Sequence, residues 1–213
     1  DSMPVNTIHA SYAAHQKKAR RVRDAVAGSD AIKGRGTEYL PNPDPEDTDR
    51  YAVYKKRAIW LGVTKRTHDG MMGGVFRKAP EVELPAVIEY MLDDADGSGM
   101  SLTQFSRRVV SDTIQDGRDG VLVDYPEAED GLTREQTQGL RATLRPYVSE
   151  SIINWRRAGE DLVLVVLSET YDEIKDEFTV EQKQQFRVPS LDATGSRQRV
   201  FRGEDVVADV YPR

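Results

Sequence analysis

The chain contains no cysteine. Disulfide bonds, thiolate metal sites and cysteine nucleophiles are therefore excluded, and synthesis in a reducing, intracellular compartment fits this composition. Histidine is also scarce, because the 213 residues include only His9, His15 and His68. These three lie on separate segments without a carboxylate at metal-ligand spacing, so we predict no metal site of the zinc type.

Long hydrophobic runs are missing as well. No stretch approaches the roughly 18 consecutive apolar residues that a membrane span requires. The N-terminus lacks the basic and apolar regions of a signal peptide. With 38% apolar and 31% charged residues, the composition predicts a soluble protein with much solvated surface and no membrane partner. A chain of this length can still bury a real core.

The usual catalytic signatures are not found. The glycine-rich stretches 34–37 and 70–74 lack the Gly-Lys-Ser/Thr ending of a P-loop. There is no Gly-x-Ser-x-Gly elbow, and adjacent acids such as Asp93 and Asp94 are more often solvated surface than an acid–base pair. We therefore predict that the protein is not an enzyme, with no catalytic residue and no cofactor.

Charge is spread unevenly along the chain. Residues 1–78 hold 15 Lys/Arg and 9 Asp/Glu, whereas residues 79–213 hold 15 and 27. The first segment thus carries +6 and the second −12, which suggests a basic face beside an acidic body. Chance and ordinary solvated helices are the simpler explanation of the same numbers.

The first half of the sequence has helical periodicity. Residues 10–27 predict a helix that resembles an arm, followed by a flexible loop at 33–37, because its apolar stripe is thin: Tyr12, Ala19, Val22 and Val26. A helix with Asp44 as cap and Pro45 in its first turn has an apolar face of Tyr51, Tyr54, Ala58 and Leu61. Further helices are expected over 63–76, after Pro85 (with Val87, Ile88, Met91 and Leu92 inward), over 102–115 and over 133–144.

The second half changes to strand patterns. A short strand is expected at 121–125, and others at 148–155, 162–169, 185–191 and 198–202, with a hairpin turn at 192–196. Residues 206–213 are extended but have no evident partner, so we expect the chain to continue in a longer protein. The predicted fold is α+β: a helical N-terminal half followed by a mainly antiparallel sheet. The expected units are a helical arm and loop (1–41), a helical subdomain (42–118) and an α/β region (119–213).

Residues 94–105 resemble a calcium-binding EF-hand loop at their start. Asp94, Asp96, Ser98 and Gly99 occupy loop positions 1, 3, 5 and 6, but position 12 is Phe105 instead of the bidentate Glu. A second interpretation accounts for more residues, because the run Ser101 to Gln104 is a capping box for the following helix. We therefore predict a helix entry rather than a calcium site.

Two further groups are candidates for contacts with partners. The residues that can neutralise phosphates on the first helix are Lys17, Lys18, Arg20, Arg21 and Arg23. A solvated helix face without a partner explains this run equally well. The aromatic residues predicted to anchor a core or a subunit interface are Tyr51, Tyr54, Trp60 and Trp155.

Several stretches resemble a portal-protein family of tailed bacteriophages, long catalogued as a domain of unknown function. The resemblance lies in residues 51–60, 64–70, 74–80, 101–126 and 145–156. Together they look like the N-terminal half of such a protein and cover roughly residues 37–213, without a single catalytic signature.

The resemblance implies a subunit of a ring, usually of twelve copies, at one vertex of the capsid. Double-stranded DNA would enter and leave the virion through its channel, and the terminase, capsid and tail or adaptor proteins would be its partners. Assembly would take place in the cytoplasm of the bacterial host. The fold expected from the family is that of the portal wing. A DNA-binding adaptor or head-completion protein that acts through residues 10–27 is the alternative, and a calcium-responsive module is a third.

Overall fold

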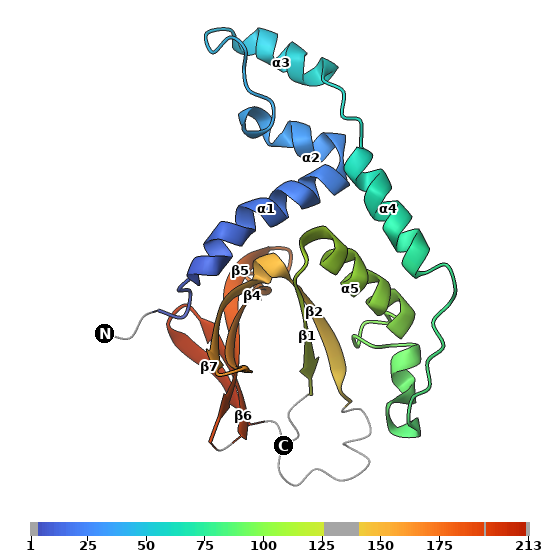
Figure 1. Cartoon of the computed structure of the whole chain (residues 1–213). Helices are drawn as coiled ribbons and strands as arrows, with labels where there is room; N and C mark the ends of the chain where they lie inside the picture. The colour runs from blue at the N-terminus through green and yellow to red at the C-terminus, as the bar shows by residue number, and fades with distance from the viewer. Residues whose placement is uncertain (1–3, 126–140, 194, 212–213) are drawn as a thin grey trace.

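The chain is an α+β protein, as the sequence predicts. The computed structural model describes residues 4–125, 141–193 and 195–211. A helical half that ends at Asp116 is followed by a two-stranded sheet and a five-stranded sheet, both antiparallel. Figure 1 shows the helices arranged over and beside the two sheets, with α3 (Thr48–Arg57) farthest from them.

The other helices have the following bounds: α1 (Ala10–Ala27), α2 (Ser29–Gly34), η1 (Gly36–Glu38), α4 (Val63–Val75), η2 (Ala86–Leu92), α5 (Leu102–Asp116) and η3 (Ser149–Ser151), where η marks a 3-10 helix. The strands are β1 (Asp119–Asp124), β2 (Thr143–Val148), β3 (Ile152–Ala158), β4 (Asp161–Ile174), β5 (Val180–Asp192), β6 (Gly195–Arg202) and β7 (Asp205–Val210). The predicted loop at 33–37 is thus wrong, because short helices occupy it.

Helix α1 is part of the core, so the prediction of an arm is wrong. Tyr12 is only 3% exposed and packs with Ile153, Val166, Phe186 and Val188 of the large sheet. Its hydroxyl donates to the Glu150 carbonyl, at 2.7 Å. The thin stripe sufficed because the single large side chain of Tyr12 fills the space above the sheet.

Helix α3 starts later than predicted and contributes nothing to the core. Its cap is Asp47, whose side chain accepts from the Arg50 N–H at 2.8 Å, rather than Asp44. Asp44 instead accepts from the Glu46 N–H in the preceding turn. None of the residues of α3 is buried. Of the predicted apolar face only Tyr51 and Tyr54 lie on the helix, because α3 ends at Arg57, before Ala58 and Leu61.

The C-terminal helix of the helical half follows the prediction closely. Ser101 and Gln104 form both hydrogen bonds of the capping box before α5, and Phe105 is buried. In the preceding η2, Met91 is buried as predicted, whereas Val87 is exposed. The tighter 3-10 winding changes which side chains share a face, so a helical pattern of period 3.6 misplaces Val87.

The five-stranded sheet is a simple meander, in the order β3-β4-β5-β6-β7. The hairpin predicted between β5 and β6 is confirmed, with Asp192 opposite Gly195. The C-terminal segment does have a partner, contrary to the prediction, because β7 pairs with β6 from Gln198↔Val210 to Arg202↔Asp205. The helix predicted over 133–144 is wrong at its end, where Thr143 and Leu144 belong to β2; residues 133–140 lie outside the described residues.

Strands β4 and β5 extend well beyond their neighbours. Strand β3 pairs with β4 only up to Leu167, and β6 pairs with β5 only from Phe186 onward. From there, β4 and β5 continue together to the pair Ile174↔Val180. We call residues 168–185 the ribbon, since it is a two-stranded projection from a five-stranded sheet. Such a ribbon has little independent stability and no third strand to shield it.

One arginine joins three helical elements above the sheet. Arg23 on α1 donates to Asp112 at 2.8 Å, to Asp116 at 3.0 Å and to Glu150 at 2.5 Å. Burial would lower the pKa of Arg23, but its hydrogen bonds to Asp112 and Glu150 outweigh that effect and raise it. The fully buried Ser149 donates to the same Asp116, at 2.5 Å. Helix α1, α5 and η3 are therefore held together by charge.

A second polar cluster joins the small sheet to the large one. Glu169 accepts hydrogen bonds from Tyr147, from Arg187 at 2.7 Å and from Gln185 at 2.8 Å. Burial alone would raise the pKa of Glu169, but the hydrogen bonds from Arg187 and Tyr147 keep it below its ordinary value. Because Tyr147 belongs to β2, this cluster sets how the β1–β2 hairpin lies against the sheet.

Replacement of Arg23 by Ala should lower the free energy of unfolding by about 2–4 kcal/mol, because three carboxylates would lose their cation. Urea denaturation followed by circular dichroism measures this change. Arg21→Ala, on the exposed side of the same helix, is the matched control and should change stability by less than about 0.5 kcal/mol. Equal effects of the two variants would contradict the role assigned to Arg23.

Candidate functional site

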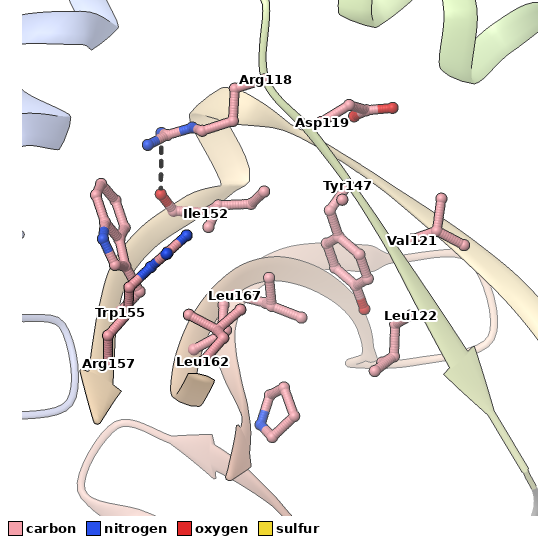
Figure 2. A pocket seen from close by; sticks show the side chains of 13 residues that line it. Arg118, Asp119, Val121, Leu122, Tyr147, Ile152, Trp155, Arg157, Leu162 and Leu167 are labelled. Atoms are coloured by element: carbon pink, nitrogen blue, oxygen red, sulfur yellow. Dashed lines mark hydrogen bonds between the residues drawn. The ribbon is translucent and has the colours of Figure 1, made fainter. Parts of the chain in front are cut away.

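The β1–β2 hairpin and the large sheet enclose a groove of about 450 Å³. Figure 2 shows it from close by, with the strand β1 on one side and Trp155 on the other. Its walls are mostly apolar and come from five strands: Val121 and Leu122 on β1, Tyr147 on β2, Ile152 and Trp155 on β3, Leu162, Val165 and Leu167 on β4, and Pro189 on β5. Val121 and Leu162 are largely exposed there.

Gly120 allows the hairpin to lie this close to the sheet. A Cβ atom at Gly120 would be 3.0 Å from Cδ1 of Ile152 and 3.7 Å from Cβ of Tyr147. Contacts of 3.0 Å are tighter than nine in ten real ones, so a larger residue would require the Ile152 side chain or the hairpin to shift. The depth of the groove thus depends on a glycine in a strand, which is a common mark of close backbone approach.

Three charged residues line the groove, and two of them are arginines. Arg118 donates to the carbonyls of Ser149 and Ile152, at 3.0 and 3.4 Å, and lies over the Trp155 ring. Arg157 is exposed and has no carboxylate partner among the described residues. In Figure 2 its side chain runs past Trp155 toward Ile152. The groove therefore combines apolar walls with an available cation.

The third charged residue, Asp119, is an unusual acid. Both of its carboxylate oxygens are buried without a hydrogen-bond partner in the described chain. Burial and the nearby charge of Asp112 raise the pKa of Asp119 to about 6. A raised pKa of this kind is found at functional sites, but also at structural ones. At neutral pH most Asp119 side chains carry a charge that the fold disfavours.

The lining of the groove in the described chain includes no serine, threonine or histidine, and its only carboxyl is that of Asp119. Among the described residues, no group of three His, Asp or Glu is placed to hold a metal ion. In the loop before α5, Asp94 and Asp96 accept from the backbone N–H groups of Gly99, Ser98 and Met100. These contacts make the loop a helix entry, as the sequence predicts.

One trio of side chains has the connectivity of a hydrolase triad without its surroundings. His68 lies 3.2 Å from Asp69 and 3.0 Å from the hydroxyl of Ser111. Ser111 lies in the middle of α5, and it lines neither the groove nor the smaller hollow near Phe76. A nucleophile needs a substrate site and oxyanion donors beside it. The trio instead connects α4 to α5.

The structure divides the predicted phosphate-contacting residues into two sets. Lys17, Lys18, Arg20 and Arg21 are exposed on α1. They form no ion pair within the described chain. Arg23 lies on the inner side, where its charge is used by the three carboxylates. Contact with nucleic acid remains a prediction for the four exposed residues, and for Arg23 the structure supplies a different role.

The predicted aromatic anchors are also divided. Trp155 packs against the main core and stacks on His9, with ring centroids 4.1 Å apart. Tyr51 and Tyr54 contact each other on α3, and the Tyr51 hydroxyl donates to the Leu40 carbonyl. Trp60 and Tyr54 remain exposed. Only Trp155 is a core anchor, and the interface role of the other three stays a prediction.

Sequence analysis did not identify the groove or the tip of the ribbon. The groove residues come from five strands, and the charged pair Arg118 and Asp119 lies in a sequence, Gly117 to Gly120, that is typical of an ordinary turn. Phe178 follows Lys175, Asp176 and Glu177 in a polar stretch. A large apolar residue in such a polar stretch was the sequence signal that pointed to the exposed tip.

The sequence matches no protein-family model, and no curated protein is significantly similar to it. None of the described helices is long and apolar enough to cross a membrane.

Replacement of Asp119 by Asn should stabilise the protein at pH 7 by about 1–3 kcal/mol. The folded-state pKa of about 6 lies above the unfolded value, so the wild type loses stability as pH rises from about 4 to 6. Urea denaturation of both proteins at several pH values measures this difference. The gap between them should be small at pH 4, grow up to pH 6 and then stay constant; a gap that does not change with pH would contradict the assignment.

Proposed function

We propose that the chain is a non-catalytic subunit of a ring-shaped assembly, and that this ring is a phage portal through which double-stranded DNA passes. The observation that carries the first part is the amount of exposed surface. The chain has 15064 Å² of accessible surface, whereas a monomeric protein of 24.0 kDa is expected to have roughly 10,000 Å². An excess of this size is typical of a subunit whose partners cover part of it.

Exposed apolar residues on the helical half support the same conclusion. Between α3 and α4, Ile59 is 86% and Leu61 78% exposed, and Trp60 between them is also exposed. We call residues 48–66 the helical arm; this segment is different from the N-terminal arm predicted over residues 1–41. Isolated exposed apolar residues are ordinary, but consecutive ones on a projecting element mark a contact surface. Figure 1 shows this arm standing away from both sheets.

The charges of the two projections are opposite. The helical arm has six Lys/Arg and one Asp, whereas residues 170–182 of the ribbon have five Asp/Glu and one Lys. Opposite charge on different surfaces of one chain favours head-to-tail association, and repeated head-to-tail contacts close a ring when the rotation allows. The identification with a portal rests on the sequence resemblance described above.

Purified wild-type protein should form a single large species of about a dozen copies. Multi-angle light scattering measures its mass, and electron microscopy of the same fraction shows whether the species is a ring with a central channel. Ile59→Ser with Leu61→Ser should reduce the mass, because these side chains lose the apolar contact. Val87→Ser, at another exposed apolar position, is the control. A wild-type monomer at high concentration would contradict the proposal.

A DNA-binding adaptor is the second candidate, and the exposed cations on α1 favour it. If Lys17, Lys18, Arg20 and Arg21 all contact phosphates, the logarithm of the binding constant should fall with the logarithm of salt concentration with a slope of about −3.6. Arg20→Ala with Arg21→Ala should reduce this slope to about −1.8, as measured by fluorescence anisotropy. Arg108→Ala on α5 is the control. Binding that does not respond to salt would exclude this function.

A further inference from the structure

We infer that the groove beneath the β1–β2 hairpin is a receptor for Phe178 at the tip of the ribbon of a second copy of this chain. This inference rests on the proposed function, because it specifies one contact by which copies associate. It assigns an occupant to a groove whose apolar walls have none within the described chain. The occupant is an aromatic residue on an acidic turn.

The ribbon presents Phe178 outward on a constrained turn. Phe178 is 88% exposed, more than any other large apolar residue among those described. Asp176 accepts from the backbone N–H groups of both Phe178 and Thr179, at 2.9 Å. The Lys175 N–H donates to the Thr179 carbonyl, at 3.0 Å, and closes the turn. An exposed aromatic side chain on an ordered turn costs less entropy on binding than one on a mobile loop.

The ribbon tip carries a net charge opposite to that of the groove lining. Glu173 and Glu181 are engaged with Lys175 and Lys183. Asp172 and Glu177 have no cation partner among the described residues, and they flank the exposed apolar side chains of the tip. The groove lining holds two arginines, Arg118 and Arg157, neither of which pairs with a carboxylate among the described residues, and one acid, Asp119, so its formal charge is positive. Charge therefore favours the acidic ribbon as the occupant and disfavours the basic helical arm.

The size of the groove agrees with this assignment. Its volume of about 450 Å³ falls within the roughly 300–1,000 Å³ of cavities that hold bound groups. Aromatic residues that fill a partner's pocket are the usual dominant contacts of interfaces. Phe178 has one apolar neighbour on each side of the turn, Ile174 and Val180, and both are exposed. The side chains of Ile174 and Val180 can cover the rim of the groove after the phenyl ring of Phe178 has entered it.

The contact has to be between two copies. The groove floor includes Leu167, and the ribbon leaves the sheet there and continues seven residues to Ile174. At about 3.3 Å per residue, its tip lies roughly 23 Å from the floor of its own groove. A paired ribbon cannot fold back over that distance. Because donor and receptor surfaces differ, the contact is head-to-tail, which is the type that builds rings or filaments.

The test separates the two surfaces. Phe178→Ser removes the donor and keeps the groove, whereas Leu162→Glu keeps the donor and places a negative charge at the groove wall. Leu162 is half exposed, so both variants should fold, and circular dichroism checks this. Each variant alone should weaken self-association by about 30-fold or more in Kd, as measured by sedimentation velocity. Val87→Ser and Leu191→Glu, at exposed positions outside both surfaces, are the matched controls and should leave association unchanged.

Mixing the two variants is the decisive step. The Phe178→Ser chain still offers an intact groove, and the Leu162→Glu chain still offers an intact Phe178. An equimolar mixture should therefore form a heterodimer through one intact contact, at concentrations at which each variant alone stays monomeric. A mixture in which both stay monomeric would overturn the inference, because the two surfaces would not be partners.

The remaining outcomes distinguish this inference from the proposed function. If the variants associate like the wild type, the groove contact is wrong and the ring proposal stands on its other surfaces. If the wild type does not associate at any concentration tested, both are wrong.

Discussion

The arrangement of the helical half depends on the charge of one side chain, Arg23. Its guanidinium contacts two acids of α5 and Glu150 of η3, while its own helix packs Tyr12 onto the large sheet. Helix packing alone would leave several tilts of similar energy, because the buried face of α1 is so narrow. Three directional ion pairs select one of them. The position of α4 follows, since it packs between α1 and α5.

The same region explains why the groove has its unusual acid. Three aspartates of one short segment, Asp112, Asp116 and Asp119, lie near a single arginine that reaches only the first two. Asp119 is left without a hydrogen-bond donor, and its pKa rises because burial and a neighbouring charge disfavour ionisation. A polar network that is satisfied at its centre and unsatisfied at its rim costs stability there.

The two projections give the molecule its large surface. The ribbon is long because β4 and β5 extend beyond the strands next to them. The helical arm is exposed because no residue of α3 is buried. Neither contributes to the core, yet both carry large apolar residues. This distribution of apolar surface is what a subunit needs if its partners complete it, and it links the fold to the proposed assembly.

Local sequence chemistry determined much of the secondary structure. The capping box at Ser101, the hairpin turn near Asp192 and the helix over 10–27 were predictable because each depends on residues close in the chain. Tertiary contacts determined which faces of these elements became buried. The thin stripe of α1 became core because the sheet offered it a surface. The fuller stripe predicted for α3 did not, because the helix ends before half of it and buries none of its residues. Likewise, the sequence shows that Arg23, Asp119 and Phe178 carry charge or apolar area. Only the fold brings Arg23 to Glu150, 127 positions away, lines one groove from five strands and leaves Phe178 exposed at the end of the ribbon.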